Sequence, residues 1–266
     1  MTHRSTHIAT MEYAFRATLT NIVVANLIYS TMFILIQEPA AYGLFPNFYK
    51  NNSWWLGKVS MMQAVPCTVA TGALQVFMAI NRLSALVNPT KHLQIWNEAR
   101  VRRGLFSIWL TIAILCIPLI YPIEGSHYEF VSPIKAVGLG FVILGTLPNV
   151  VYQTLAMISG ALFEITALSI YLFIGCRMKR LKKLPQSAIS ATVAAVLVST
   201  GAFLLMIVMV PDVLAARIAG KAIWSDEMFY ALFKFANAYN NAIAPWVMVI
   251  HYSNVRFSFA VKSIFD

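Results

Sequence analysis

The sequence predicts an all-α protein, a polytopic bundle of transmembrane helices, and three observations support this prediction. The chain of 266 residues is 59% hydrophobic and 11% charged, whereas a soluble domain is about 45–50% apolar and about 25% charged. Its mean hydropathy is +0.69. Several apolar stretches reach the roughly 20 residues that a helix needs to cross a bilayer. No soluble core hides this much apolar side chain, so lipid must form part of the solvent.

Six stretches are expected to span the membrane, and together they form a single domain over residues 1–266. The expected spans are residues 17–36, 59–80, 104–121, 151–174, 188–210 and 229–250. Residues 136–147 are apolar but short and rich in glycine, so a loop lying against the helices or at the membrane interface is expected there. Residues 252–266 are expected to form a cytoplasmic tail, which can lie at the interface as a short helix.

The distribution of Lys and Arg predicts the orientation. Of the 20 Lys and Arg residues, fourteen lie on one side: before the first span, after the last span, or in the second and fourth connections between spans. Five lie in the other connections, and Lys234 lies inside a span. The positive-inside rule therefore places both termini in the cytoplasm of a multi-pass plasma membrane protein. Asn51-Asn52-Ser53 is a glycosylation sequon in a gap assigned to the outside. Because the net charge of +10 follows membrane topology, no nucleic-acid partner is expected.

Several functional classes lack their sequence signatures. No helix carries Arg at every third position, as a voltage sensor does, and no TVGYG-like filter is present. No G-x-S-x-G element accompanies an intramembrane His, so an enzyme is not expected. No pair among Cys67, Cys116 and Cys176 has ligand spacing, so neither a zinc site nor a disulfide framework is indicated. Neither a metal nor a cofactor is expected. The remaining classes are a bundle that signals, a small-solute transporter or a structural bundle.

Two motifs bring out a resemblance to a known family. "NRLSALVNPTKHLQIW" (81–96) places Arg82 at the cytoplasmic mouth of the second span, seven residues before a proline. This is similar to the end of the third helix of seven-helix receptors. Together with "APWVMVIHYSNVRFSF" (244–259), it resembles the nematode serpentine chemoreceptors, most closely class gamma and class V. The resemblance implies a G protein-coupled chemosensory receptor that binds a small external ligand and signals to a heterotrimeric G protein.

The resemblance also implies which helices are present. The six spans would correspond to helices 2–7 of a seven-helix receptor. Residues 1–16 would then be similar to the first inner loop of the family, and the first helix would be missing. Two departures stand out: Asn81 replaces the usual carboxylate beside the arginine, and the outer loops lack the cysteines of the usual disulfide.

The G-protein-facing residues predicted on this basis are Arg82, Arg177, Lys179 and Arg180. Arg82 would donate hydrogen bonds to the C-terminus of a G-protein α subunit once the bundle opens. The alternative is that Arg82 only reaches lipid phosphates and fixes the helix in place. The basic run "CRMKRLKKLP" (176–185) is likewise an orientation signal that also contacts the G protein or anionic lipids.

Polar residues within the spans are the candidates for a ligand pocket: Gln63, Cys67, Gln153, Glu164, Lys234 and Asn237. A carboxyl group in mid-span is costly unless it is protonated, paired or hydrated. Glu164 is therefore expected to be neutral and hydrogen-bonded to a neighbouring helix. Lys234 is expected to reach outward or to line the pocket mouth, too far along its helix to pair with Glu164. The alternative for the whole set is structural hydrogen bonding between helices.

Overall fold

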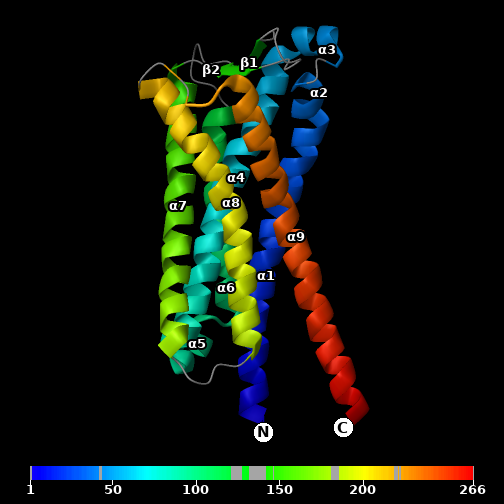
Figure 1. The fold of residues 1–266 in the computed structure, drawn as a ribbon, viewed down its shortest axis with the longest axis vertical. Helices are drawn as coiled ribbons and strands as arrows, with labels where there is room; N and C mark the ends of the chain where they lie inside the picture. The colour runs from blue at the N-terminus through cyan, green and yellow to red at the C-terminus, as the bar shows by residue number, and fades with distance from the viewer. Residues whose placement is uncertain are drawn as a thin grey trace.

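The computed structural model describes residues 2–41, 44–120, 128–131, 142–145, 147–180, 186–218, 221 and 223–265. The described residues form long helices that lie side by side (Figure 1). The six long helices are α1 (Thr2–Met32), α4 (Ser53–Val87), α6 (Glu98–Ile120), α7 (Leu147–Arg180), α8 (Gln186–Ile218) and α9 (Asp226–Phe265). Shorter helical elements are η1 (Phe33–Gln37), α2 (Glu38–Ala41), α3 (Pro46–Asn51) and α5 (Pro89–Ile95). The predicted all-α class therefore describes the bundle.

Four stretches of the described helices are long and apolar enough to cross a membrane: Tyr13–Ala40, Pro66–Val87, Thr154–Met178 and Thr192–Asp212. They overlap the predicted spans 17–36, 59–80, 151–174 and 188–210. The other two predicted spans, 104–121 and 229–250, fall in α6 and α9, which do not meet this criterion over their described residues. The count of six spans therefore stays a prediction, as does the correspondence with helices 2–7.

The bundle has two distinct ends. Both chain termini and α5 lie at one end, which we call the terminal end, and α3 lies at the other with strands β1 (Tyr128–Val131) and β2 (Val142–Gly145) (Figure 1). We call that second end the hairpin end. The strands pair antiparallel, with Tyr128 opposite Gly145. The prediction of a loop over residues 136–147 is thus wrong at 142–145, because pairing with β1 satisfies the backbone of an apolar segment too short to span.

Both terminal segments differ from expectation. Residues 2–16 belong to α1 rather than to a loop, and residues 252–265 continue α9 rather than forming a separate interfacial helix. The reason is local, since neither segment contains proline or glycine to interrupt the hydrogen-bond ladder. Figure 1 shows the ends of both helices extending beyond the other helices at the terminal end.

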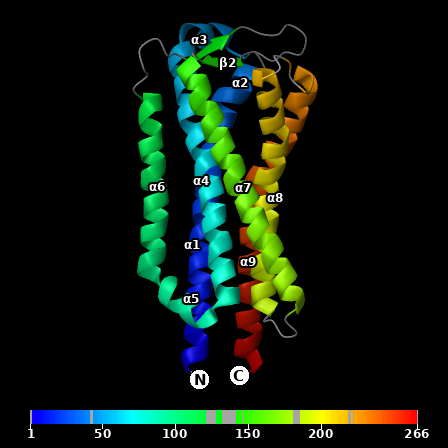
Figure 2. The same cartoon turned by 90° about the vertical axis from the view of Figure 1, so that its left-hand side faces the viewer.

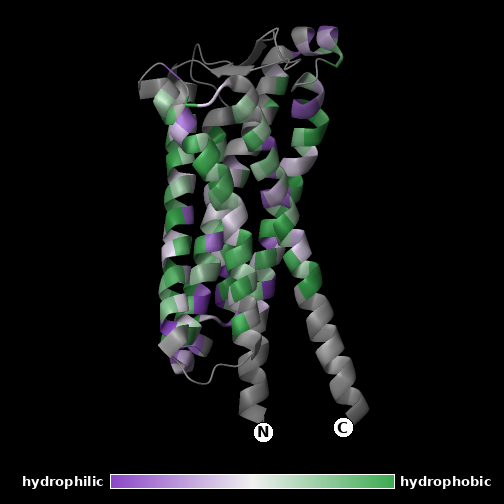
Figure 3. Ribbon diagram, in the orientation of Figure 1, coloured by the Kyte–Doolittle hydropathy of each residue, from purple (hydrophilic) through white to green (hydrophobic). Residues whose placement is uncertain are grey.

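The α4 helix packs against α1, α6, α7 and α8, so it lies at the centre of the bundle. The largest buried cluster lies towards the terminal end and includes Phe15, Leu74, Met78, Ile174 and Val198. Large apolar side chains also cover the outside, where Leu172 of α7 is 72% exposed. Figure 3 shows hydrophobic residues predominating along the described middle of the bundle. Such an outer surface is suited to lipid.

Two helices approach unusually closely at a glycine. A Cβ atom added to Gly201 of α8 would lie 2.9 Å from the Cα of Asn240 in α9. Small residues at helix interfaces allow this approach in membranes. It brings the backbone of α8 against the polar stretch of α9 that lines the candidate site.

Candidate functional site

The chain folds back onto α4 where that helix ends. The Asn88 side chain accepts a hydrogen bond from the Lys91 backbone N–H at 3.2 Å and so caps α5. Pro89 suits the first helical position, because it needs no N–H partner there. Ser84 Oγ of α4 lies 2.8 Å from His92 Nδ1 of α5. This side-chain hydrogen bond holds α5 against α4.

Aromatic packing reinforces the turn. The Trp96 ring meets the Phe77 ring edge-to-face with 4.8 Å between centroids, and it stacks on the His92 ring at 6.2 Å. A Cβ atom on Gly104 would lie 2.8 Å from the Phe77 ring, so α6 approaches the same ring closely. Figure 2 shows α5 joining the terminal ends of α4 and α6. The turn is therefore held together by side chains of α4 and α5 and by the close approach of α6.

Arg82 is buried in the protein, with 5% of its surface exposed. Its guanidinium carbon lies 4.4 Å from the centroid of the Phe15 ring of α1, a distance typical of a cation–π interaction. The neighbouring Asn81 is also buried, and neither of its side-chain polar atoms has a hydrogen-bond partner among the described residues. The guanidinium group is thus packed within the bundle, and both the G-protein and the lipid-anchor interpretations of Arg82 stay predictions.

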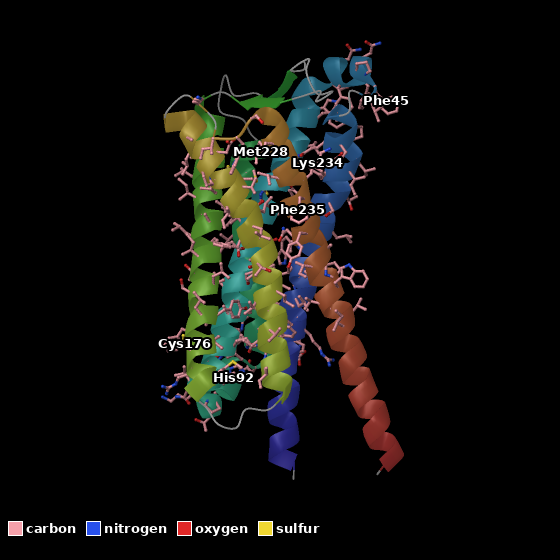
Figure 4. The ribbon with its side chains drawn as sticks, viewed as in Figure 1. Phe45, His92, Cys176, Met228, Lys234 and Phe235 are labelled. Atoms are coloured by element: carbon pink, nitrogen blue, oxygen red, sulfur yellow. The ribbon has the colours of Figure 1, made fainter. Side chains whose placement is uncertain are left out.

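The other predicted basic residues lie at the terminal end of α7. Arg177 is exposed there, and the neighbouring Cys176 side chain is visible on the outside of the helix (Figure 4). The backbones of Lys179 and Arg180 complete α7, but their side chains lie outside the described residues. Arg177 is thus available to a partner at the same end of the bundle as Arg82.

A small cavity lined by both polar and apolar side chains lies between α1, α4, α7, α8 and α9, with a volume of about 20 Å³. This is room for one water-sized group and little more. Three of the predicted pocket residues, Cys67, Glu164 and Asn237, line it. Its lining among the described residues is Asn26, Tyr29, Cys67, Thr68, Thr71, Glu164, Ala202, Leu205, Met206, Asn237, Asn240 and Asn241.

Hydrogen bonds link three helices around this cavity. Asn26 of α1 donates to the Asn240 carbonyl of α9 at 3.2 Å, and Thr71 of α4 donates to Asn26 Oδ1 at 3.3 Å. Within α9, Asn241 donates to Asn237 Oδ1 at 3.1 Å. Asn241 Oδ1 has no hydrogen-bond partner among the described residues and remains available as an acceptor.

Glu164 is buried where α7 meets α4 and α8. The side-chain amide of Gln75 in α4 satisfies its hydrogen bonds when its nitrogen faces this carboxyl group. The nitrogen then donates to Glu164 Oε2 at 2.6 Å and to Ser199 Oγ at 2.9 Å. Gln75 and Ser199 are fully buried. Glu164 thus has a hydrogen-bond partner on a neighbouring helix, as expected for it, while its protonation state stays a prediction. We call this cluster the Gln75–Glu164–Ser199 joint.

Lys234 does not line the cavity. Its Nζ lies 3.2 Å from Glu38 Oε2, which joins α9 to α2 near the hairpin end (Figure 4). Glu38 was not predicted as a partner of Lys234, and 196 residues separate the two in the sequence. The side chains of Gln63 and Gln153 lie outside the described residues, so their predicted place in a pocket remains a prediction.

Several polar members of the site were not predicted from the sequence. Asn26, Thr71, Gln75 and Ser199 sit within or beside apolar spans, and all four are buried. Their polarity inside a span was the available signal, since such residues usually face the bundle interior. Phe15 carried no such signal, because one more aromatic residue is unremarkable in this composition.

Two further predictions concern the surface and metals. Asn51 ends α3 at the hairpin end and is exposed, so the sequon is accessible. Among the described residues, no group of three or more His, Cys, Asp or Glu side chains is placed to hold a metal ion.

Comparisons with known proteins connect this arrangement to a family. The family model described as "Serpentine type 7TM GPCR chemoreceptor Srv" matches residues 2–263. The Caenorhabditis elegans protein "Serpentine receptor class V-1" is 28% identical over 149 residues, which cover 54% of this chain and 44% of that relative. The aligned part thus spans less than half of the relative's length.

Proposed function

Since the chain belongs to the Srv family of serpentine seven-transmembrane G protein-coupled chemoreceptors, we propose that it binds a small ligand from outside and signals to a heterotrimeric G protein. The family is a receptor family, and the apolar helices make the chain an integral membrane protein. What we propose for this chain is that it binds a ligand and couples to a G protein. The buried position of Arg82 against Phe15 is the observation that carries it.

The proposed orientation places the terminal end in the cytoplasm and the hairpin end outside. The positive-inside rule supports it, because fourteen of the 20 Lys and Arg residues then lie on the cytoplasmic side. Both termini emerge at one end of the bundle (Figure 1), which agrees with this orientation. The exposed sequon at Asn51 would then face outside, while Arg82, Arg177 and α5 would face a cytoplasmic partner.

Arg82 supplies the proposed switch. A guanidinium group presents five donors in a planar fork, which suits the carbonyl and carboxylate groups of a peptide terminus. Here that fork is buried against an aromatic ring, so a partner has no access to it. An alternative conformation that separates α4 from α1 would expose it. A ligand drives this change only by binding the open conformation more tightly than the closed one.

The transporter alternative predicts discontinuous helices at a central binding site. Pro66, Pro211 and Pro245 lie inside α4, α8 and α9, yet each helix continues through its proline. The described helices therefore offer the transporter mechanism no broken segment around the cavity. The receptor is the function that we propose.

The test compares Arg82→Lys with Arg82→Ala in cell membranes, using nucleotide exchange on a panel of G-protein α subunits. Lysine keeps the charge but loses the planar fork. We expect about a tenfold or greater loss of G-protein activation in both variants, equivalent to about 1.4 kcal/mol of lost coupling, at unchanged surface expression. Arg102→Lys is the matched control, because Arg102 is exposed and its ion pair among the described residues is with Glu98 of its own helix, at 2.7 Å.

Two results would count against the proposal. Full activation by Arg82→Lys would show that Arg82 acts only as a charge. A properly inserted protein that activates no α subunit under any stimulus would favour the transporter.

A further inference from the structure

We propose that Glu164 receives the amino group of a small ligand, so that the cavity selects primary amines over alcohols and carboxylic acids of the same size. This inference rests on the proposed receptor function and deepens it by naming the ligand class. Three features of the cavity support it: its charge balance, its unused acceptor and its size.

The charge balance favours an amine. Among the described residues of the cavity wall, Glu164 is the one ionisable acid apart from the weakly acidic Tyr29 and Cys67, and none is a Lys, Arg or His. Among the described residues Glu164 takes part in no ion pair, and its described partner is the uncharged Gln75 amide. The described lysine on the neighbouring helix, Lys234, pairs with Glu38 instead. A carboxyl group inside a membrane is costly without a counter-charge, and a ligand amine supplies one.

An amine also adds no net charge to the membrane interior. A free amine and a carboxylic acid are both neutral. Transfer of one proton from the acid oxygen to the amine nitrogen turns them into an ammonium–carboxylate pair, which is also neutral overall. A carboxylate ligand would instead place a second acid beside Glu164, which like-charge repulsion opposes. An alcohol offers a single donor and no charge.

The acceptors match the donors of an ammonium group. A primary ammonium group has three N–H donors, as the lysine side chain does. The cavity offers the Glu164 carboxyl oxygens and the unpartnered Oδ1 of Asn241. Leaving that buried acceptor unsatisfied costs free energy, which an N–H donor recovers. Alcohols and acids satisfy fewer of these groups.

The size of the cavity selects the head group. A volume of about 20 Å³ holds one water-sized group, and an ammonium group is of that size. The side chains of Leu205 and Met206 contribute apolar surface to the same lining. Methionine adapts its shape easily, so a short alkyl chain is accommodated by side-chain movement. The ligand class is therefore a small primary amine with a short apolar tail.

Binding at Glu164 also explains how the ligand acts on the bundle. The Gln75 amide donates to Glu164 of α7 and to Ser199 of α8. An ammonium group that takes over the carboxyl oxygens competes with Gln75 for them. The Gln75–Glu164–Ser199 joint then loosens, and α4, α7 and α8 are freer to move relative to one another. Gln75 lies seven residues before Arg82 on α4, so the same helix carries both sites.

The experiment uses the full chain in lipid nanodiscs and three probes of matched size: n-propylamine, 1-propanol and propanoate. Each probe is titrated, and its Kd is obtained from the rise in Tm, since a ligand that binds the folded state raises Tm. We expect n-propylamine to bind at least about tenfold more tightly than 1-propanol, because charge-assisted hydrogen bonds are the stronger ones. Propanoate should produce no shift.

Three variants test the role of the carboxyl group. Glu164→Gln keeps the shape and should reduce the preference for the amine to within about twofold. Glu164→Asp keeps a carboxyl group and should retain the preference even if it lowers Tm. Glu38→Gln is the matched control, because it removes a carboxyl group from α2 outside the cavity, and it should leave the amine preference unchanged.

Equal binding of n-propylamine and 1-propanol, or a preference that survives Glu164→Gln, would overturn the inference. The outcome is separable from that of the proposed function. If the amine binds in a manner that depends on Glu164 but no G-protein activation is found, the ligand site is supported and the receptor function is overturned. G-protein activation by 1-propanol or propanoate, with no binding of the amine, would do the reverse.

Discussion

Replacing Phe15 with leucine tests whether its ring holds Arg82 in the buried position. The ring centroid lies 4.4 Å from the guanidinium carbon, and both residues are almost fully buried. Leucine keeps an apolar side chain in the core but removes the aromatic face. The substitution therefore removes the cation–π interaction while keeping most of the packing.

The expected effect follows from the strength of the lost interaction. A cation–π contact is worth about 0.5–1 kcal/mol at exposed sites and about 2 kcal/mol when desolvated. At about 1.4 kcal/mol, its loss shifts the equilibrium between the closed and open conformations about tenfold. If the open conformation makes up about 1% of unliganded receptor, Phe15→Leu raises it to about 10% and ligand-independent signalling rises in proportion.

The assay is G-protein nucleotide exchange without ligand, divided by the amount of receptor at the cell surface. Phe15→Tyr keeps the ring and should remain near wild type in basal activity. Leu19→Val removes one methylene from the same buried cluster and controls for packing loss alone. Unchanged basal activity in Phe15→Leu, or an equal rise in Leu19→Val, would refute the reasoning.

Two further predictions concern packing and topology. Gly201→Ala should destabilise the protein by about 1–3 kcal/mol, because the new Cβ would lie 2.9 Å from the Cα of Asn240. In Gly175→Ala the new Cβ meets nothing within 4 Å, so this control should be neutral or stabilising by up to about 1 kcal/mol. Thermal unfolding in detergent compares the two variants, and equal Tm values would contradict the close approach. Tags at both termini should be protected from protease in intact cells while Asn51 is glycosylated in a manner lost in Asn51→Gln, and a C-terminal tag that is cleaved in intact cells would contradict the proposed topology.

Helix positions were the most predictable part of the fold. Each predicted span lies wholly or almost wholly within a described helical stretch, because a run of about 20 apolar residues is a local property that the bilayer selects. The errors lie at the ends, where α1 begins at Thr2 and α9 continues to Phe265. Residues 1–16 were expected to resemble a loop and residues 252–266 a separate tail, although neither segment contains a proline or glycine that would interrupt a helix.

The candidate site was predictable in part. A carboxyl group in mid-span identified Glu164, and the end of an apolar run identified Arg82, since both stand out against their own neighbours in the sequence. The partner of Lys234 was not predictable in this way. Its partner Glu38 lies outside the spans and 196 residues away, so depth along one helix gave no information about it.

By itself, the sequence determined the class of protein, the positions of the helices, the charge difference between the two ends and the presence of a costly carboxyl group at Glu164. Only the tertiary structure decided that Phe15 covers Arg82, that Gln75 joins Glu164 to Ser199 and that the asparagines of α1 and α9 meet in one cavity. The physical reason is that lipid tails are as apolar as a protein core. Apolar residues therefore cover every side of such helices, and only the packing of one helix against another decides which sides face inward and at what register they meet.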